Sequence, residues 1–198
     1  MGKKELKVRE TWQDYSGANA GVAERSFFDV MSEAFEGSPF RVRSKPREFK
    51  NIYSSIKLPK EILDRIYNPD ETWSHGVIPD FAIDNIESKK TLYVEVKRQD
   101  GWVEDKERKA GRGNAHERSC KLFTPGLLAS LRATGGLGPD VLPFWVVFQG
   151  DIARDPKRVR EIWHWYEGAR DHFFLWTDSD DAAPLVKHFN KKLKKLLI

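Results

Sequence analysis

The sequence contains little sulfur and no long apolar run. Its 198 residues include one cysteine, Cys120, which excludes an internal disulfide and a zinc site built from cysteines. No apolar stretch approaches the roughly 20 residues that a membrane-spanning helix needs. The polar start, Met1 to Glu5, leads into no apolar segment of a secretory signal. These absences predict a protein that stays in a reducing cytoplasm.

Histidine pairs, linkers and repeats are also missing. None of the five histidines has a second histidine four residues away, the spacing typical of helical metal sites. We therefore interpret them as structural or surface residues: His75, His116, His164, His172 and His188. No stretch rich in Pro, Gly or Ser divides the chain, and no segment repeats. The sequence thus predicts a single domain over residues 1–198.

Positive charge is present in modest excess and is unevenly distributed. The formal net charge is +4, which by itself says little about a nucleic-acid partner. Three runs of basic residues stand out: Arg41, Arg43, Lys45, Arg47 and Lys50; then Lys97, Arg98, Lys106, Arg108, Lys109 and Arg112; then Lys187, Lys191, Lys192, Lys194 and Lys195. Each run is compatible with a solvated surface, and we prefer that interpretation for the third.

Hydrophobic periodicity in the first half predicts helices followed by a β-hairpin. Apolar residues from Ala23 to Ala34 recur at helical spacing, and Gly37 can end that helix. A second, short helix is predicted over residues 59–67, with Pro59 near its start. Residues 77–83 and 91–97 are rich in β-forming side chains, and the polar residues 85–90 between them predict a turn.

The second half alternates strands with helices. Residues 98–113 lack an apolar period and predict a loop, and 114–123 are compatible with a helix. A helix is predicted to begin at Thr124-Pro125 and to end near Arg132, and a buried strand is predicted at 143–148. The next predicted helix begins at Asp155-Pro156 and ends at Gly168, and its apolar face consists of Val159, Ile162, Trp163 and Tyr166. A strand at 173–176 and a C-terminal amphipathic helix with lysines on its outer side follow. This order predicts an α/β fold, a central sheet flanked by helices.

Three residues of the predicted hairpin can form a site for a divalent cation. Glu95 and Lys97 lie two apart on one strand, so both side chains project from the same face. Pairing of the strands brings Asp80 close to Glu95. Two adjacent carboxylates favour a hard cation such as Mg²⁺ between them, and the carbonyl of Val96 is a further candidate ligand. The same residues also fit a plain surface hairpin with an exposed Asp and a Glu–Lys pair.

A glycine-bearing segment downstream carries the side chains that best recognise bases. Arg112 and Arg118 can each bond guanine O6 and N7, and Asn114 can pair with adenine N6 and N7. The glycines permit close approach of the backbone to another molecule. A glycine loop with a capping asparagine and solvated arginines remains an alternative on these residues alone.

Both segments resemble one known family. The EcoRI family of type II restriction endonucleases carries a recognition motif that closely resembles residues 113–119 (GNAHERS) with the downstream Lys121. Asp80 and the Glu95-x-Lys97 pair stand where that family, part of the PD-(D/E)xK superfamily, keeps its catalytic residues. Further runs are similar to the member that cuts CAATTG: KRQDGW at 97–102, TPG at 124–126 and RDPKRVR at 154–160. The likeness spans most of the chain.

The resemblance implies a role for each matching residue. Asp80 and Glu95, with the Val96 carbonyl, would bind Mg²⁺, and Lys97 would serve the attacking water. The DNA-binding segment would comprise Arg112, Gly113, Asn114, Ala115, Arg118 and Lys121. Within it, Asn114 and Arg118 match residues that recognise the central AATT, and Glu117 matches a carboxylate that supports an arginine, across the dimer. Arg112 suits the guanine of the outer pair.

The implied protein is a homodimer that cuts double-stranded DNA at a palindrome, CAATTG, and leaves 5′ overhangs. Such an enzyme works beside an adenine methyltransferase that protects the same site. Two other functions remain open on the residues: a DNA-binding module without cleavage, and a structure-specific repair nuclease with the same core. The intact set of Asp80, Glu95 and Lys97 argues against the first, and the base-recognising set argues against the second.

Overall fold

The structure is a computed structural model, and it describes residues 21–67, 73–99 and 117–198. Within these ranges, no helix combines the length and the apolar character needed to cross a membrane. The helices and short helical turns with assigned bounds are α2 (Lys60–Leu63), η1 (Glu117–Phe123), α3 (Pro125–Gly135), η2 (Asp151–Ala153), α4 (Pro156–Trp165), η3 (Arg170–His172), α5 (Ala183–His188), η4 (Phe189–Leu193) and η5 (Lys194–Leu197). Residues 21–34 are helical as well.

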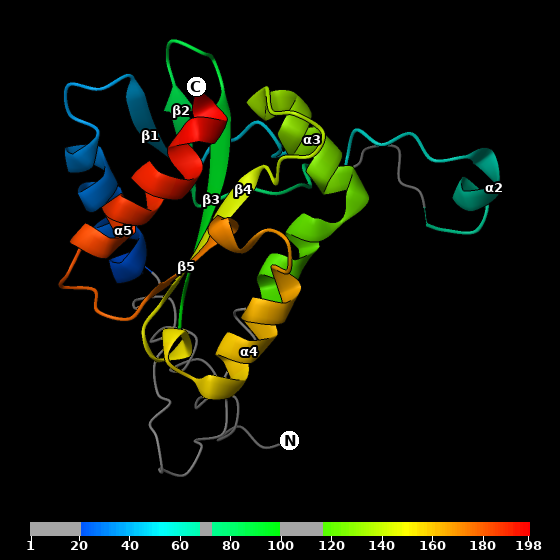
Figure 1. Ribbon diagram of the computed structural model, residues 1–198. Helices are drawn as coiled ribbons and strands as arrows, with labels where there is room; N and C mark the ends of the chain where they lie inside the picture. Colours follow the sequence, from blue (N-terminus) through cyan, green and yellow to red (C-terminus); the bar gives the residue numbers. More distant parts are fainter. Residues whose placement is uncertain (1–20, 68–72, 100–116) are drawn as a thin grey trace.

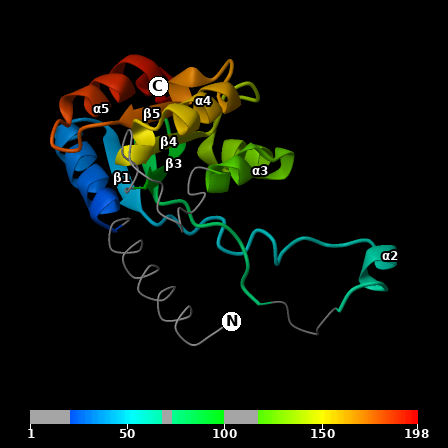
Figure 2. The same cartoon turned by 90° about the horizontal axis from the view of Figure 1, so that it is seen from below.

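A five-stranded mixed sheet with the order β1-β2-β3-β4-β5 forms the centre of the described chain (Figure 1). Its strands are β1 (Phe40–Ser44), β2 (Phe81–Asn85), β3 (Thr91–Arg98), β4 (Phe144–Gln149) and β5 (Phe173–Trp176). The first three strands pair antiparallel, whereas β4 runs parallel to both β3 and β5. The sheet is flanked by helices (Figures 1 and 2), so the predicted α/β class is confirmed.

Alternation along the strands gives the sheet two apolar faces. On β2, Phe81 and Ile83 pack into one core and Ala82 packs into the other. The first core lies under the helical residues 21–34 and the C-terminal helical segment. The second lies under η1, α3 and α4. Because both faces are buried, the central strand β4 is apolar throughout its first five residues.

Local signals in the sequence account for several helix boundaries. The Asp155 side chain accepts hydrogen bonds from the backbone N–H groups of Lys157 at 2.9 Å and Arg158 at 3.3 Å, as expected for an N-cap residue. Helix α3 starts at Pro125 and ends before Gly136, which has a φ of 62°. Thr124 precedes α3, but it makes no side-chain cap; its hydroxyl donates to the carbonyl of Lys121 at 2.8 Å.

The C-terminal amphipathic helix is confirmed, although it is interrupted by a π-helical turn at η4. Leu185, Phe189, Leu193 and Leu197 are fully buried at a spacing of four residues. The carbonyl of Leu197 accepts a hydrogen bond from Asn85 Nδ2 at 2.7 Å, which ties the chain end to the β2–β3 hairpin. The buried stripe and this bond place the helix over the first core.

Five predictions from the sequence were wrong or incomplete. Strand β1 was not predicted, because its charged positions at 41 and 43 masked the alternation typical of an edge strand. Residues 77–80 precede β2 instead of belonging to it, and α2 covers only four residues. Trp163 is half-exposed with Arg170 over its ring, so it lies at the margin of the buried face of α4. The segment 117–123 is a 3₁₀ helix, and residues 114–116 lie outside the described ranges.

Buried His172 fits the structural role that the sequence predicted. Its Nδ1 lies 2.9 Å from the carbonyl oxygen of Phe144, at the start of β4. Burial lowers the pKa of His172, and the hydrogen bond to Phe144 only partly offsets that effect. The neutral ring therefore joins η3 to the central sheet.

The contact between α3 and β3 gives the first prediction. A Cβ at Gly135 would lie 2.5 Å from the carbonyl oxygen of Thr91, whereas a Cβ at Gly126 in the same helix meets nothing within 4 Å. We expect Gly135→Ala to lower the free energy of unfolding by about 1–3 kcal/mol through overpacking. Gly126→Ala should raise it by about 0.4–1 kcal/mol. Denaturant unfolding of both variants checks this, and equal shifts would contradict the close packing of α3 on β3.

Candidate active site

The end of β1, the start of β2 and the middle of β3 bring the site residues into one row. Ser44 of β1 pairs with Phe81 of β2, which pairs with Val94 of β3. Extending this register by one residue puts Asp80 between Lys45 and Glu95. The backbone N–H of Lys45 donates to the carbonyl of Asp80 at 2.9 Å, which confirms this extension on the β1 side.

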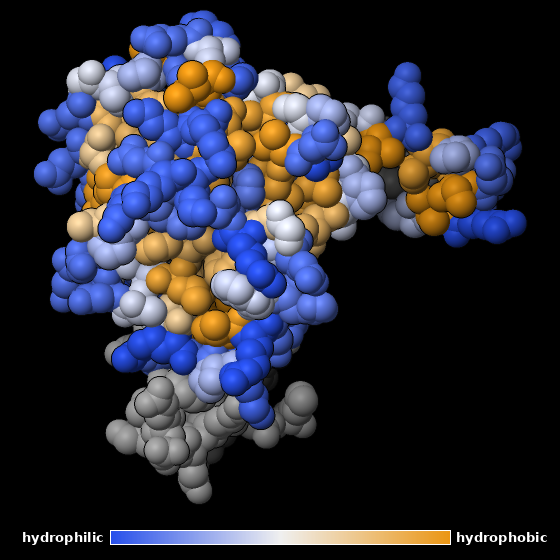
Figure 3. Space-filling view, in the orientation of Figure 1, coloured by the Kyte–Doolittle hydropathy of each residue, from blue (hydrophilic) through white to orange (hydrophobic). Residues whose placement is uncertain are grey.

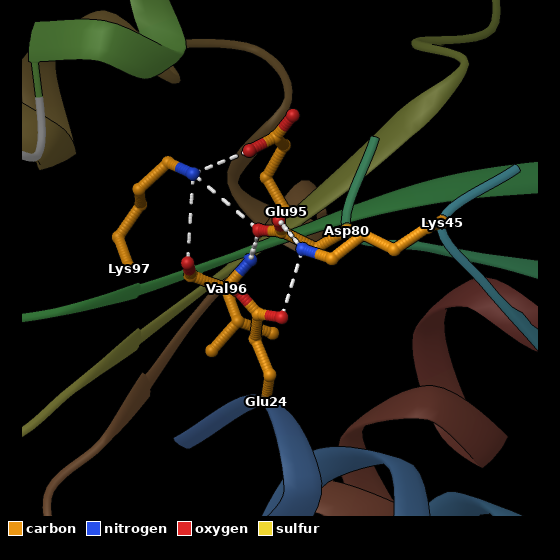
Figure 4. Close-up of polar contacts among 6 residues, drawn as sticks. All are labelled: Glu24, Lys45, Asp80, Glu95, Val96 and Lys97. Atoms are coloured by element: carbon orange, nitrogen blue, oxygen red, sulfur yellow. Dashed lines mark hydrogen bonds and ion pairs between the residues drawn. The ribbon is translucent and has the colours of Figure 1, made fainter. Parts of the chain in front are cut away.

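Asp80 is held through both carboxylate oxygens (Figure 4). Its Oδ2 accepts hydrogen bonds from the backbone N–H of Val96 at 2.9 Å and from Lys97 Nζ at 3.4 Å. Its Oδ1 accepts from Lys45 Nζ at 2.9 Å. The side chain therefore has a fixed orientation toward β3.

Three oxygen atoms converge on the ammonium group of Lys97. Lys97 Nζ contacts a carboxylate oxygen of Glu95, lies 3.4 Å from Asp80 Oδ2, and lies 3.5 Å from the carbonyl oxygen of Val96. The Lys97 and Glu95 side chains are only 17% and 7% exposed. The structure thus brings together the three residues that were predicted to be catalytic and the carbonyl that was predicted to be a ligand.

Burial and charge act in opposite directions on these groups. Burial alone would raise the pKa of Asp80, but the Lys97 charge and the Lys45 hydrogen bond outweigh it and lower that pKa. Burial raises the pKa of Glu95, and the neighbouring Asp80 charge adds to the effect. Burial alone would lower the pKa of Lys97, but the two carboxylates outweigh it and raise that pKa. Lys97 is consequently an ammonium ion beside an ionised Asp80.

Lys45 and Glu24 belong to the same network, and sequence reasoning missed both as site residues. Lys45 Nζ also pairs with Glu24 at 2.8 Å, which links the helical residues 21–34 to Asp80. Lys45 has a φ of 49°, a left-handed conformation in which its backbone still bonds Asp80. Lys45 directly follows the alternating residues Phe40–Ser44, and this position at a strand end could have identified it. The signal was missed because β1 itself was not predicted.

The 3₁₀ turn η1 presents part of the predicted DNA-binding segment. Ser119 and Leu122 are buried, while Glu117, Arg118 and Lys121 are exposed. The charge of Lys121 acts to lower the pKa of Glu95, so η1 lies near the catalytic residues. The other predicted members lie outside the described residues: Arg112, Gly113, Asn114 and Ala115.

The oxygen atoms around Lys97 are also a suitable donor set for a divalent cation. In the described part of the chain, no three His, Cys, Asp or Glu side chains gather as a metal site, so a cation would rely on two carboxylates and the Val96 carbonyl. Mg²⁺ commonly binds through one or two carboxylates and keeps several waters. Three oxygens already converge on one positive charge, and this donor set therefore fits Mg²⁺.

Comparison with known proteins decides the family. A family model described as type II restriction enzyme MunI matches residues 1–198. The type II restriction enzyme MunI of Mycoplasma sp. is 52% identical to this chain over 201 residues, which covers the whole of both proteins. The chain belongs to the MunI family of type II restriction enzymes. It is thereby a site-specific endonuclease by family.

Similarity to MunI extends to the three-dimensional structure. The crystal structure of MunI restriction endonuclease in complex with cognate DNA matches with a TM-score of 0.81 and 51% identity, covering 94% of this chain and 97% of that chain. The prediction of a restriction-endonuclease-like core, with a central mixed sheet flanked by helices, is therefore confirmed. A structure-specific repair nuclease, one of the two alternatives open on the sequence, does not fit this membership.

Proposed function

We propose that this chain is a Mg²⁺-dependent restriction endonuclease that cuts double-stranded DNA at CAATTG and leaves 5′ overhangs. The convergence of Asp80, Glu95 and the Val96 carbonyl on the Lys97 ammonium is the observation that carries the proposal. Such a cluster offers both a cation site and a donor for developing negative charge. A catalytically silent DNA-binding module has no need for that combination.

In this proposal Asp80, Glu95 and the Val96 carbonyl hold the ion, and Lys97 acts on the water. Bound Mg²⁺ supplies Lewis-acid polarisation of a phosphoryl oxygen and lowers the pKa of a bound water. The backbone N–H of Val96 keeps Asp80 turned toward β3. As an ammonium, Lys97 donates hydrogen bonds, so it orients the attacking water and stabilises negative charge at phosphorus. Water attack forms the new P–O bond as the bond to the 3′ oxygen breaks.

Base recognition is assigned to the segment that leads into η1. Asn114 and Arg118 recognise the central AATT, Arg112 bonds the outer guanine, and Glu117 orients an arginine. Gly113 and Ala115 allow close backbone approach, and exposed Lys121 contacts phosphate. The exposed side of η1 and its proximity to Glu95 support this arrangement.

The palindromic site implies a two-fold dimer, because each subunit then meets the same half-site. We therefore include a homodimer of single-domain subunits in the proposal. A cell that makes this enzyme in its cytoplasm needs an adenine methyltransferase for the same sequence, because its own DNA carries uncut sites.

Sequencing the ends of every fragment from a digest of long unmethylated DNA tests the proposal. With Mg²⁺ we expect ends confined to CAATTG, and with EDTA we expect no cutting. Ends at another AATT-centred palindrome would reject only the role of Arg112. Specific binding without cleavage in Mg²⁺ or Mn²⁺ would instead favour the inactive binding module.

The Lys45 contact gives a further prediction. Lys45→Met removes one charge-assisted hydrogen bond from Asp80, and such bonds contribute about 1.5–3 kcal/mol. Because the Lys45 side chain is 47% exposed, solvent screening places the effect near the lower end. We expect about a tenfold lower kcat with little change in KM for DNA.

Steady-state kinetics of three variants check the role of Lys45. Lys45→Arg should recover part of the loss, because it keeps the charge between Glu24 and Asp80. Lys50→Met removes an exposed lysine of the same basic run and serves as the control. An unchanged kcat for Lys45→Met would limit Lys45 to a structural role.

A further inference from the structure

Between β1 and β2 the chain leaves the body of the protein as a projecting arm, residues 49–79, described except for 68–72. Figures 1 and 2 show α2 far from the sheet and its covering helices in both views. The described arm has a stem (residues 49–54 with 74–77) and a tip (residues 55–67 and 73). Its return leg ends at Asp80, so the arm is continuous with the candidate active site.

The stem is an ordered structure that fixes where the arm leaves the body. The backbone N–H of Val77 donates to the carbonyl of Phe49 at 3.0 Å, and that of Tyr53 donates to His75 at 3.0 Å. The Tyr53 and His75 rings lie 5.0 Å apart. A Cβ at Gly76 would lie 2.0 Å from the carbonyl oxygen of Phe49, so only glycine permits this approach. Phe49 itself is buried in the second core.

Apolar side chains are concentrated on this arm. Seven of the eleven large hydrophobic residues that are exposed in the described chain belong to it. Tyr67 and Trp73 are 91% and 88% exposed. The other five are Ile56, Leu58, Ile62, Ile66 and Ile78. Figure 3 shows hydrophobic surface on the arm around α2, far from the cores that bury such side chains elsewhere.

The exposed apolar area of the arm is that of an interface. Taking roughly 150–250 Å² for a whole large side chain, the exposed parts of these seven residues come to about 600–1,000 Å² in all. Monomeric proteins rarely expose an apolar patch above about 300–600 Å². A stable protein–protein interface of standard size buries about 800 Å² on each partner.

The charge of the arm argues against DNA as the molecule that covers it. From residue 49 to residue 79 the sequence has four basic and four acidic side chains, a formal charge of 0 with histidine neutral. DNA-binding surfaces are more polar than protein interfaces and strongly positive. An apolar arm without excess positive charge fits another protein surface.

We propose that the arm docks on a second copy of this chain. The inference rests on the proposed function, which requires two subunits on a palindrome, and it assigns the surface that joins them. Under two-fold symmetry each arm makes the same contact, so the arms add their buried areas. The last residues of the arm lead directly into Asp80, just before β2. Docking of the arm therefore also restricts the motion of the segment that carries this carboxylate.

Sedimentation velocity of the full-length chain without DNA tests the proposal. The arm variant is Tyr67→Ser with Trp73→Ser, and the control is Ile86→Ser with Ile198→Ser, which removes two exposed apolar residues away from the arm. We expect a dimeric wild type and control, and a dimer dissociation constant raised about a hundredfold or more in the arm variant. Circular dichroism verifies that the arm variant is folded. An unchanged dissociation constant, or a wild type that is monomeric at all concentrations, overturns the proposal.

Cross-linking between isotopically labelled and unlabelled wild-type subunits gives a second measurement without any substitution. Mixed cross-links from Lys57 or Lys60 are expected, and mixed cross-links that exclude the arm overturn the inference. Cleavage by the wild type is recorded separately, so failure of the nuclease assignment is distinguishable from failure of the arm contact. Loss of DNA binding with an intact dimer in the arm variant would assign the arm to DNA and also overturn the inference.

Discussion

Asp80→Ala and Lys97→Ala are each expected to lower the cleavage rate at least about 10³-fold while specific DNA binding stays measurable. Asp80 receives hydrogen bonds from Val96, Lys97 and Lys45, so its removal takes away a cation ligand and the anchor for two lysines. Lys97→Ala removes the ammonium on which three oxygens converge. Single-turnover cleavage of a duplex with one site measures the loss, and a gel-shift assay measures binding.

A neighbouring carboxylate provides the matched control for these variants. Asp84 lies on β2 like the segment that follows Asp80, but it pairs with Arg43 and Thr91 away from Lys97. Asp84→Asn should therefore keep nearly full activity. Asp80→Asn keeps an acceptor for Val96 and guards against misfolding as the cause of any loss. If Asp80→Asn and Lys97→Ala cut at the wild-type rate, the catalytic assignment is wrong.

Methylation of N6 on the adenine that Asn114 contacts is expected to block cleavage of CAATTG. A bidentate contact from asparagine needs the N6 amino group as donor, and each good contact of this kind discriminates by about 1–3 kcal/mol. A palindrome presents two such contacts, so the combined loss is about 2–6 kcal/mol, or roughly 30- to 10⁴-fold in rate. Cleavage of synthetic duplexes with and without the modified adenine measures this effect.

A duplex methylated on an adenine outside CAATTG is the control for methylation and should be cut normally. Asn114→Ala should lose most of its dependence on the methyl group, because both substrates then lack the contact. Rapid cutting of the methylated site by the wild type would reject the role of Asn114. It would also remove the reason for a partner adenine methyltransferase.

Much of the fold follows from signals that are local in the sequence. The strand at residues 173–176 has the predicted bounds, and the helix that follows Asp155-Pro156 has the expected N-cap. These predictions worked because a cap needs only neighbouring residues and because a strand buried on both faces is continuously apolar. Strand β1 was missed because charged side chains at 41 and 43 masked its alternation, and because the burial of Phe40 depends on helices far away in the sequence.

Some residues of the candidate site were likewise predicted from the sequence, whereas others were found only in the structure. Strand periodicity already placed Glu95 and Lys97 on one face, and the predicted hairpin pairing brought Asp80 close to them before the family resemblance was considered. Lys45 and Glu24 were not accessible to such reasoning, because they lie 35 and 56 residues before Asp80 in the sequence. Lys45 reaches Asp80, and Glu24 reaches Lys45, only when β1 and the first helix are both in place.

The sequence by itself thus determined the α/β class, the candidate catalytic side chains and the family resemblance, since period, spacing and motif are properties of nearby residues. Only the tertiary structure decided that β1 pairs antiparallel with β2 and that β4 pairs parallel with β3. It also decided that Lys45 completes the hold on Asp80 and that the apolar residues around α2 face solvent. These features depend on strand register and burial, which arise from contacts between distant segments, and composition alone does not specify them.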